Sequence, residues 1–223
     1  MITEKEFRFQ LCEVGKRVYS KGFVAANDGN FSVRLGTDNY LITPTNISKG
    51  FMNPEDIVLL TREGKPVGNK KPSSEYKMHL EIFKNRQDVN AIVHTHPPFS
   101  TAFGITRISI EKYVLPEVIA TLGIIPLIKY ETPSTQALAD VVGKASKKYD
   151  AMLLESHGLV TVGSDLWDAY YKHERVEHTL KILYYAKTLG IVKAIPPEKV
   201  KELFQAYSVS DRIKNLGSSE KSV

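Results

Sequence analysis

The order of strand-like and helix-like segments is the feature of this sequence that most limits its fold. Two short apolar runs, residues 31–35 and 40–43, flank the turn-forming residues 36–39. This arrangement predicts a β-hairpin. Helical patterns then alternate with further strands along the chain. Because the early strands form hairpins instead of βαβ units, we expect an α/β fold with a mixed or antiparallel sheet and helices on its faces.

The same patterns place the remaining elements. We expect strands at residues 57–61, 90–95, 124–129, 151–155 and 159–162, and helices at residues 3–21, 76–86, 97–104, 134–147, 165–189 and 197–207. Thr3 and Glu6 form a capping box for the first helix, and Ser73 or Ser74 is the expected N-cap of the second. A chain of 223 residues fits one domain. We therefore expect a single domain at residues 1–210 and a polar, frayed tail at 211–223.

Composition and charge exclude several classes of protein. The hydrophobic share of 42% is too high for a disordered chain, and the longest apolar stretch, residues 113–128, is broken by prolines and an acid, so no membrane span is expected. Cys12 is the single cysteine, so no internal disulfide can form. The net charge of +5 comes with lysines spread along the chain, which favours a lysine-rich surface over a nucleic-acid site. The acidic N-terminal residues do not fit a signal peptide, and we expect a cytoplasmic protein.

The histidines are the first candidates for chemistry. His94 and His96 lie two residues apart at the end of an apolar strand, so both imidazoles face the same side. His157 lies in a turn between two strand-like runs, beside a glycine, and is able to complete a set of three ligands, the pattern of catalytic zinc. A pair of satisfied histidines at a strand end explains the spacing equally well. We expect His79 to serve helix packing, and His173 and His178 to lie on a helix surface because their spacing of five separates them around the helix.

A helix start carries the most informative acid. Glu75 follows Ser73 and Ser74 directly before the helix that begins at residue 76. Helix N-termini bind anions through free backbone amides, and the serine hydroxyls add donors, so this turn can hold a phosphate and carry a carboxylate. Ordinary capping is the alternative explanation. Asn30 and the Thr45-Asn46 pair lie in further polar turns, which by themselves indicate no function.

Together these segments resemble a known family. Gly29-Asn30 before a strand, Ile42-Thr-Pro-Thr45, Pro72-Ser-Ser-Glu75, His94-Thr-His96 and Ser156-His157-Gly158 occur in the order and at the distances typical of the class II aldolase/adducin-type family. The resemblance covers residues 7–207 and is greatest to the L-fuculose-1-phosphate aldolases, with the L-ribulose-5-phosphate 4-epimerases as a sibling group. It implies a three-layer α/β/α fold with a central, mainly antiparallel sheet, and a homotetramer with active sites between subunits.

The resemblance also implies roles for the motif residues. His94, His96 and His157 would bind Zn²⁺ with Glu75 as the fourth ligand, and Glu75 would also be the catalytic acid and base. The phosphate of a sugar substrate would lie against five residues, which are Asn30, Thr45, Asn46, Ser73 and Ser74. The implied reaction is reversible cleavage of a ketose 1-phosphate to dihydroxyacetone phosphate and an aldehyde. The related epimerases carry aspartate at the position of Glu75, which favours the aldolase.

The sequence departs from the fuculose enzymes at the phosphate turn and on the aldehyde side. Asn46 replaces a glycine in the phosphate turn, and asparagine tolerates the left-handed backbone that such a turn needs. Glu117 aligns with a catalytic tyrosine, with Tyr113 nearby but out of register, whereas Tyr207 matches the C-terminal tyrosine. We therefore expect Glu117 and Tyr207 to act on the aldehyde side and the aldehyde to differ. An epimerase, a methylthioribulose-1-phosphate-type dehydratase and an adducin-like scaffold without catalysis are the alternatives.

Overall fold

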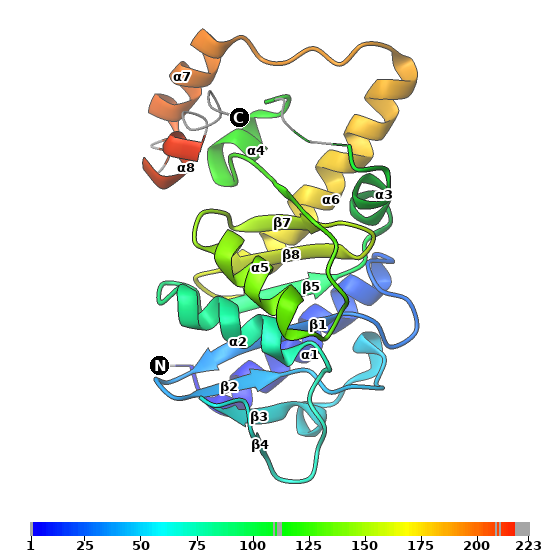
Figure 1. The fold of residues 1–223 in the computed structure, drawn as a ribbon, viewed down its shortest axis with the longest axis vertical. Helices are drawn as coiled ribbons and strands as arrows, with labels where there is room; N and C mark the ends of the chain where they lie inside the picture. Colours follow the sequence, from blue (N-terminus) through cyan, green and yellow to red (C-terminus); the bar gives the residue numbers. More distant parts are fainter. Residues whose placement is uncertain (1, 109, 111–112, 208, 210, 217–223) are drawn as a thin grey trace.

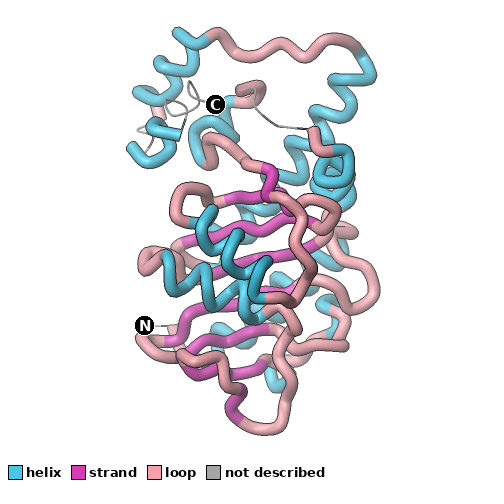
Figure 2. The backbone as a smooth tube through the Cα atoms, in the orientation of Figure 1, coloured by secondary structure: helices cyan, strands magenta, loops and turns pink. Residues whose placement is uncertain are grey.

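An eight-stranded sheet forms the middle layer of the molecule (Figures 1 and 2). The computed structural model describes residues 2–216 except 109, 111–112, 208 and 210. The strand order is β4-β3-β2-β1-β5-β8-β7-β6, and every neighbouring pair is antiparallel except β6 with β7. The strands are β1 (Asn30–Leu35), β2 (Asn39–Ile42), β3 (Val58–Thr61), β4 (Pro66–Val67), β5 (Ala91–Thr95), β6 (Leu127–Ile128), β7 (Ala151–Leu154) and β8 (Gly158–Gly163). The predicted α/β fold with a mainly antiparallel sheet is confirmed.

Helices cover both faces of this sheet. One face packs on α2 and α5, which pass in front of the strands in Figure 1, and the other face packs on α1 and the start of α6. The helices are α1 (Glu4–Ser20), α2 (Tyr76–Asn85), α3 (Pro98–Thr106), α4 (Pro116–Thr121), α5 (Gln136–Ser146), α6 (Leu166–Leu189), α7 (Pro197–Ala206) and α8 (Asp211–Leu216), with short 3-10 helices η1 (Lys49–Phe51) and η2 (Pro54–Asp56). The three layers agree with the expectation from the family resemblance. Within the described residues, no helix is long and apolar enough to cross a membrane.

The central strand β5 shows how alternation builds the two hydrophobic cores. Ile92 packs in the core under α2 and α5, whereas Val93 packs in the core under α1 and α6. Successive side chains of a strand point to opposite faces. His94 therefore lies on the α2 side of the sheet and Thr95 on the α6 side, and this alternation sets which partners each of them meets.

The helix starts agree with the sequence in two cases and differ in one. The capping box of Thr3 and Glu6 is present as predicted, and Asp165 caps α6 at the predicted start of that helix. The predicted cap of α2 by Ser73 or Ser74 is wrong, because Glu75 occupies the N-cap position and makes no side-chain capping bond. The backbone of Ser73 is instead held next to β2, since its N–H donates to the carbonyl of Thr43. The helix consequently begins later than the serines.

The C-terminal segment and the stretch before β6 contain helices that the sequence patterns did not reveal. Residues 116–121 form α4, and residues 211–216, expected to be frayed, form α8. Ile213 and Leu216 are buried, and both lie against Gly123 just after α4. Figure 1 shows α4, α7 and α8 together at one end of the molecule, beyond β7. The remaining tail residues, 217–223, lie outside the described part of the chain.

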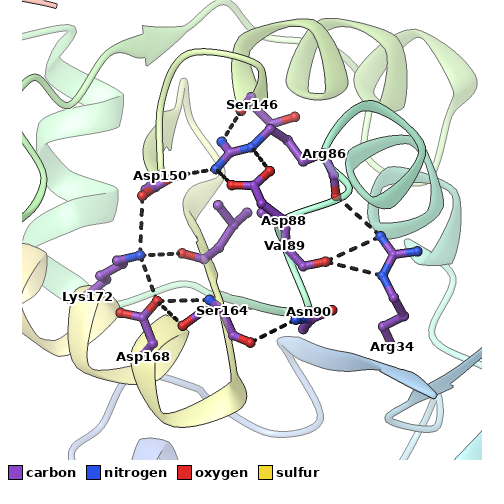
Figure 3. Close-up of polar contacts among 11 residues, drawn as sticks. Arg34, Arg86, Asp88, Val89, Asn90, Ser146, Asp150, Ser164, Asp168 and Lys172 are labelled. Atoms are coloured by element: carbon purple, nitrogen blue, oxygen red, sulfur yellow. Dashed lines mark hydrogen bonds and ion pairs between the residues drawn. The ribbon is translucent and has the colours of Figure 1, made fainter. Parts of the chain in front are cut away.

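A network of ionic contacts closes the end of the sheet where β5 begins and β8 ends (Figure 3). Arg86 donates to Asp88 and Asp150 and to the carbonyl of Ser146. Lys172 on α6 donates to the same Asp150 and to Asp168. These contacts join the ends of α2 and α5 to the start of α6 and satisfy the buried charges of Arg86 and Asp150.

Candidate metal centre

Four side chains converge at the opposite end of β5. Glu75, His94, His96 and His157 each offer one ligand atom, and these four atoms all lie within 4.8 Å of one another. The imidazole centroids are 4.8–5.1 Å apart, and two contacts join the histidines to the acid: His94 Nε2 to Glu75 Oε2 at 3.1 Å and His157 Nε2 to Glu75 Oε1 at 3.3 Å. The structure therefore brings together all four residues that the sequence suggested as metal ligands.

Different elements supply these four residues, and glycines let them approach. His94 lies near the end of β5 and His96 just beyond it, Glu75 precedes α2, and His157 lies in the turn between β7 and β8. Gly158 follows His157, and a Cβ atom there would overlap the carbonyl oxygen of Thr95 and the ring of His96. Only glycine allows the β7–β8 turn to approach the end of β5 this closely. The glycine after His157 is thus explained by the packing of the centre.

The protonation states of the cluster residues suit the binding of a cation. Burial alone would raise the pKa of Glu75, but the neighbouring His94 and His157 and the amide of Asn30 hold that pKa well below its ordinary value. Burial and the nearby His94 lower the pKa of His96 and of His157 to about 4, so both are neutral near pH 7. Burial opposes a charge on His94, but Glu75 and the carbonyl of Leu159 raise its pKa. His94 and Glu75 would hold a metal here in place of the proton that His94 carries.

The donor set fits a divalent metal. Glu75 Oε1, His94 Nε2 and His96 Nε2 are buried and, apart from the ion-pair contacts of Glu75 with His94 and His157, have no partner within the described part of the chain. His94 Nδ1 donates to the carbonyl of Leu159 over 2.9 Å, which fixes the ring and directs Nε2 to the centre. Three imidazoles and one carboxylate are donors that suit zinc and related transition metals. The buried atoms without partners are accounted for if a cation lies between them.

A chain of buried hydrogen bonds holds the acid in place. Asn30 Nδ2 donates to Glu75 Oε2 over 2.9 Å, and Asn30 Oδ1 lies 2.6 Å from His79 Nε2. His79 Nδ1 in turn lies 2.6 Å from the hydroxyl of Ser32. Burial lowers the pKa of His79 to about 3, so its neutral ring donates from Nε2 to Asn30 and accepts from Ser32 at Nδ1. The sequence indicated only helix packing for His79, whereas the structure makes it part of the support for Glu75.

A second buried histidine supports the strand end from the other face. Thr95 Oγ1 lies 2.6 Å from His173 Nε2, and His173 Nδ1 lies 3.0 Å from the hydroxyl of Thr161. The prediction that His173 lies on a helix surface is wrong, because it is fully buried. His173 belongs to the face of α6 that carries Tyr170, Val176 and Leu180 into the cores, at the spacing of a helical stripe. His178, on the other side of the helix, is exposed as predicted.

The predicted phosphate residues lie on two segments that pair with each other. Thr45 N donates to the carbonyl of Lys71, and Ser73 N donates to the carbonyl of Thr43, so the turn at residues 45–46 lies beside residues 72–74. Asn46 has a φ of 60°, the left-handed conformation expected of the residue that replaces a glycine. Ser74 is exposed and Ser73 is buried. Asn30, by contrast, is buried and engaged with Glu75, as described above.

The residues predicted for the aldehyde side lie apart from this cluster. Glu117 is exposed on the first turn of α4 and lines a cavity of about 980 Å³ between α3, α4 and α6. Tyr207 ends α7 and is 63% exposed, and Tyr113 is half-buried before α4. Among the residues described, no hydrogen bond joins Glu117 or Tyr207 to the four-residue cluster. Within the described part of one chain, these two side chains are thus not hydrogen-bonded to the cluster.

A family model named Class II Aldolase and Adducin N-terminal domain matches residues 9–184 of this sequence. This chain belongs to the class II aldolase and adducin family. The match includes all four residues of the metal-binding cluster and the whole sheet, and it confirms the family indicated by the sequence motifs.

Individual relatives share the family but differ in reaction. The chain is 38% identical over 178 residues to the L-fuculose phosphate aldolase of Methanococcus vannielii, covering 80% of this chain and 93% of that protein. It is 31% identical over 212 residues to the 5-deoxy-D-ribulose 1-phosphate aldolase of Bacillus thuringiensis, covering 93% and 97%. It is 33% identical over 188 residues to the 3-oxo-tetronate 4-phosphate decarboxylase of Haemophilus influenzae, covering 82% and 88%. A solved structure of an L-fuculose 1-phosphate aldolase superposes with a TM-score of 0.80 at 29% identity, covering 90% of this chain and 95% of that one.

Proposed function

We propose that this chain is a zinc-dependent aldolase that reversibly cleaves a ketose 1-phosphate, of the L-fuculose or a related deoxy-sugar type, to dihydroxyacetone phosphate and an aldehyde. The observation that carries this proposal is the convergence of Glu75 with three histidines on one buried point. A scaffold protein has no use for three buried ligand atoms without hydrogen bonds at that point. The relatives named as sugar-phosphate aldolases support the substrate class.

In this proposal the metal would serve as a Lewis acid, and Glu75 beside it carries the proton. A zinc ion held by the cluster would act as a Lewis acid that stabilises the enediolate formed from the ketose. In the cleavage direction the electron pair of the broken bond stays on the dihydroxyacetone phosphate fragment. The proton released from the substrate hydroxyl reaches the Glu75 carboxylate, which then gives a proton to that carbon. In the reverse direction Glu75 removes the same proton. The Asn30 amide holds the Glu75 carboxylate at the start of α2 and keeps it charged until the substrate arrives.

The remaining predicted roles complete the proposal. The phosphate lies against the paired segments that carry Thr45, Asn46, Ser73 and Ser74, with Asn30 beneath them. Four copies of the chain form a ring in the cytoplasm. The arm made of α4, α7 and α8 then carries Glu117 and Tyr207 of one subunit to the metal centre of the next, where they exchange the proton of the aldehyde oxygen. Within the described part of one chain neither residue makes a hydrogen bond to the cluster, which supports this arrangement.

A decarboxylase is the second candidate, because one relative is named for that reaction. Loss of the carboxyl group from 3-oxo-tetronate 4-phosphate leaves the same enediolate of dihydroxyacetone phosphate, and a proton from Glu75 completes the product. The aldolase and the decarboxylase therefore share the retained fragment and differ in the leaving group, which is an aldehyde in one and carbon dioxide in the other.

The leaving group decides between the two candidates. The zinc-loaded protein is given L-fuculose 1-phosphate, 5-deoxy-D-ribulose 1-phosphate or 3-oxo-tetronate 4-phosphate, and released dihydroxyacetone phosphate is measured by a coupled assay, with chelator-treated protein as the control. Release from a sugar phosphate supports the aldolase. Release with carbon dioxide from the oxo acid alone supports the decarboxylase. If none of the three is cleaved, the epimerase, the dehydratase or the adducin-like scaffold replaces both.

A further inference from the structure

Lys49 is an unusual charged residue in this fold. Its side chain is 1% exposed, and none of the other described lysine, arginine, aspartate or glutamate side chains is less exposed. It lies at the start of η1, three residues after Asn46 in the turn that is proposed to bind phosphate. Burying a charge this deeply lowers the stability of the fold unless an opposite charge accompanies it.

The partners of the Lys49 ammonium are backbone carbonyls. Lys49 Nζ donates to the carbonyl oxygens of Asn27 over 2.8 Å and of Ile47 over 2.7 Å, and no carboxylate lies within ion-pair distance of it among the residues described. The charged group whose field acts on it is Asp28, an exposed residue of the loop before β1. Burial nevertheless lowers the pKa of Lys49 to about 8. The folded protein thus holds a buried positive charge that it does not itself neutralise.

The two carbonyls place this charge between the segments of the phosphate subsite. Asn27 belongs to the loop that leads into Asn30, and Ile47 follows Thr45 and Asn46. Lys49 therefore holds the two loops together from beneath. The hydroxyl oxygen of Ser48, next to it, is also buried and makes no hydrogen bond in the described part of the chain. The site thus has an ammonium bonded only to neutral carbonyls and, beside it in the chain, a buried hydroxyl without a hydrogen-bond partner in the described part of the chain.

We propose that Lys49 supplies the positive charge that balances the phosphate dianion of the substrate. The inference rests on the proposed function, which places a phosphate against Asn30 at the end of one of these loops and against Thr45 and Asn46 in the other, and it adds a binding residue that the sequence motifs did not indicate. A phosphate dianion brings opposite charge beyond that of the exposed Asp28, and the low dielectric around the buried ammonium strengthens the attraction. The competing explanation is a purely structural clamp, in which the ammonium serves only its two carbonyls.

The two explanations differ in whether Lys49 contributes to the affinity for a phosphate group. The metal-loaded full chain is titrated calorimetrically with glycerol 3-phosphate, and glycerol is the phosphate-free match. We expect Lys49→Met to weaken glycerol 3-phosphate binding at least tenfold. Lys16→Met, which removes an exposed lysine from the neighbouring helix α1, should change it less than twofold. Equal affinities of Lys49→Met and the unchanged protein would overturn the proposal.

A second measurement on the unchanged protein decides the matter if Lys49→Met does not fold. At pH 8.5 glycerol 3-phosphate is already a dianion, because its second pKa is about 6. Lys49 is then largely uncharged in the free protein, and the ligand restores its charge, so binding must take up protons. Titrations in two buffers of different ionisation enthalpy measure this uptake. Binding without proton uptake assigns the clamp role to Lys49 and overturns the proposal. No binding of glycerol 3-phosphate at all removes the phosphate subsite from the proposed function and Lys49 with it.

Discussion

The two ends of strand β5 use buried polar groups in opposite ways. At its start, Arg86 and Lys172 each meet carboxylates, and both share Asp150 (Figure 3). At its end, His94 and His96 gather with Glu75 and His157 and leave ligand atoms without hydrogen bonds. A satisfied network contributes to a rigid fold, whereas an unsatisfied one costs stability and is kept for a ligand. The start of β5 therefore stabilises the fold, whereas its end presents ligand atoms that suit a metal.

The largest expected effect comes from removing a ligand at the end of β5. His94→Ala deletes an imidazole at the centre, and the loss of the metal's Lewis acidity should lower activity by about 10³-fold or more. The midpoint of thermal unfolding of the metal-free protein should change little, because the centre is not satisfied without its cation. Metal content by mass spectrometry and a coupled activity assay check this prediction. A variant that keeps its metal and its activity would remove His94 from the centre.

The start of β5 should respond in the opposite way. Arg86→Met leaves Asp150 and the Ser146 carbonyl without their guanidinium partner, and we expect the free energy of unfolding to fall by about 3 kcal/mol. Turnover per folded molecule should stay near the original value. Urea unfolding measures the first quantity and activity at low temperature the second. Arg62→Met is the matched control, because its pair with Asp38 is exposed and contributes under about 1 kcal/mol.

The hydrogen-bond chain behind Glu75 should have an intermediate effect. His79→Leu removes the donor that orients Asn30, so the amide is free to turn its oxygen toward Glu75. We expect metal affinity or activity to fall about 10- to 100-fold, the range found for partners of metal ligands. His178→Leu changes an exposed histidine and should have no effect. Equal losses in both variants would show that Asn30 does not depend on His79.

Acid should release the metal gradually. The pKa of His94 is raised, mainly because attraction by Glu75 outweighs burial, so protons compete for its Nε2 first as the pH falls. Below that pKa the affinity should drop by about tenfold for each pH unit. His96 and His157 add to the loss only near their pKa of about 4, because burial keeps them neutral above it. Metal titrations from pH 8 to pH 4 check the order, and an affinity independent of pH would contradict it.

Sequence patterns predicted the candidate metal ligands, but not the buried residues that support them. His94 and His96 follow from a strand period of two, and His157 from a turn with glycine. The buried roles of His79 and His173 depend on which helix face meets the sheet, and that is a property of the tertiary packing. A signal did exist for His173, since it lies in the stripe of apolar residues that α6 presents to the cores. The helix α8 could not be predicted from the sequence, because its segment is short and polar. Its two apolar residues become buried only through packing near α4.

Hydrogen exchange into dihydroxyacetone phosphate tests the central claim most directly. The metal-loaded protein is placed in heavy water with dihydroxyacetone phosphate alone, and NMR follows the loss of one hydroxymethyl proton, with and without a chelator. We expect stereospecific exchange that stops with the chelator and is lost in Glu75→Gln while part of the metal remains bound. This result does not depend on whether the leaving group is an aldehyde or carbon dioxide. Absence of exchange in protein that carries one metal ion per chain would contradict the account of Glu75 as the proton carrier beside an enediolate.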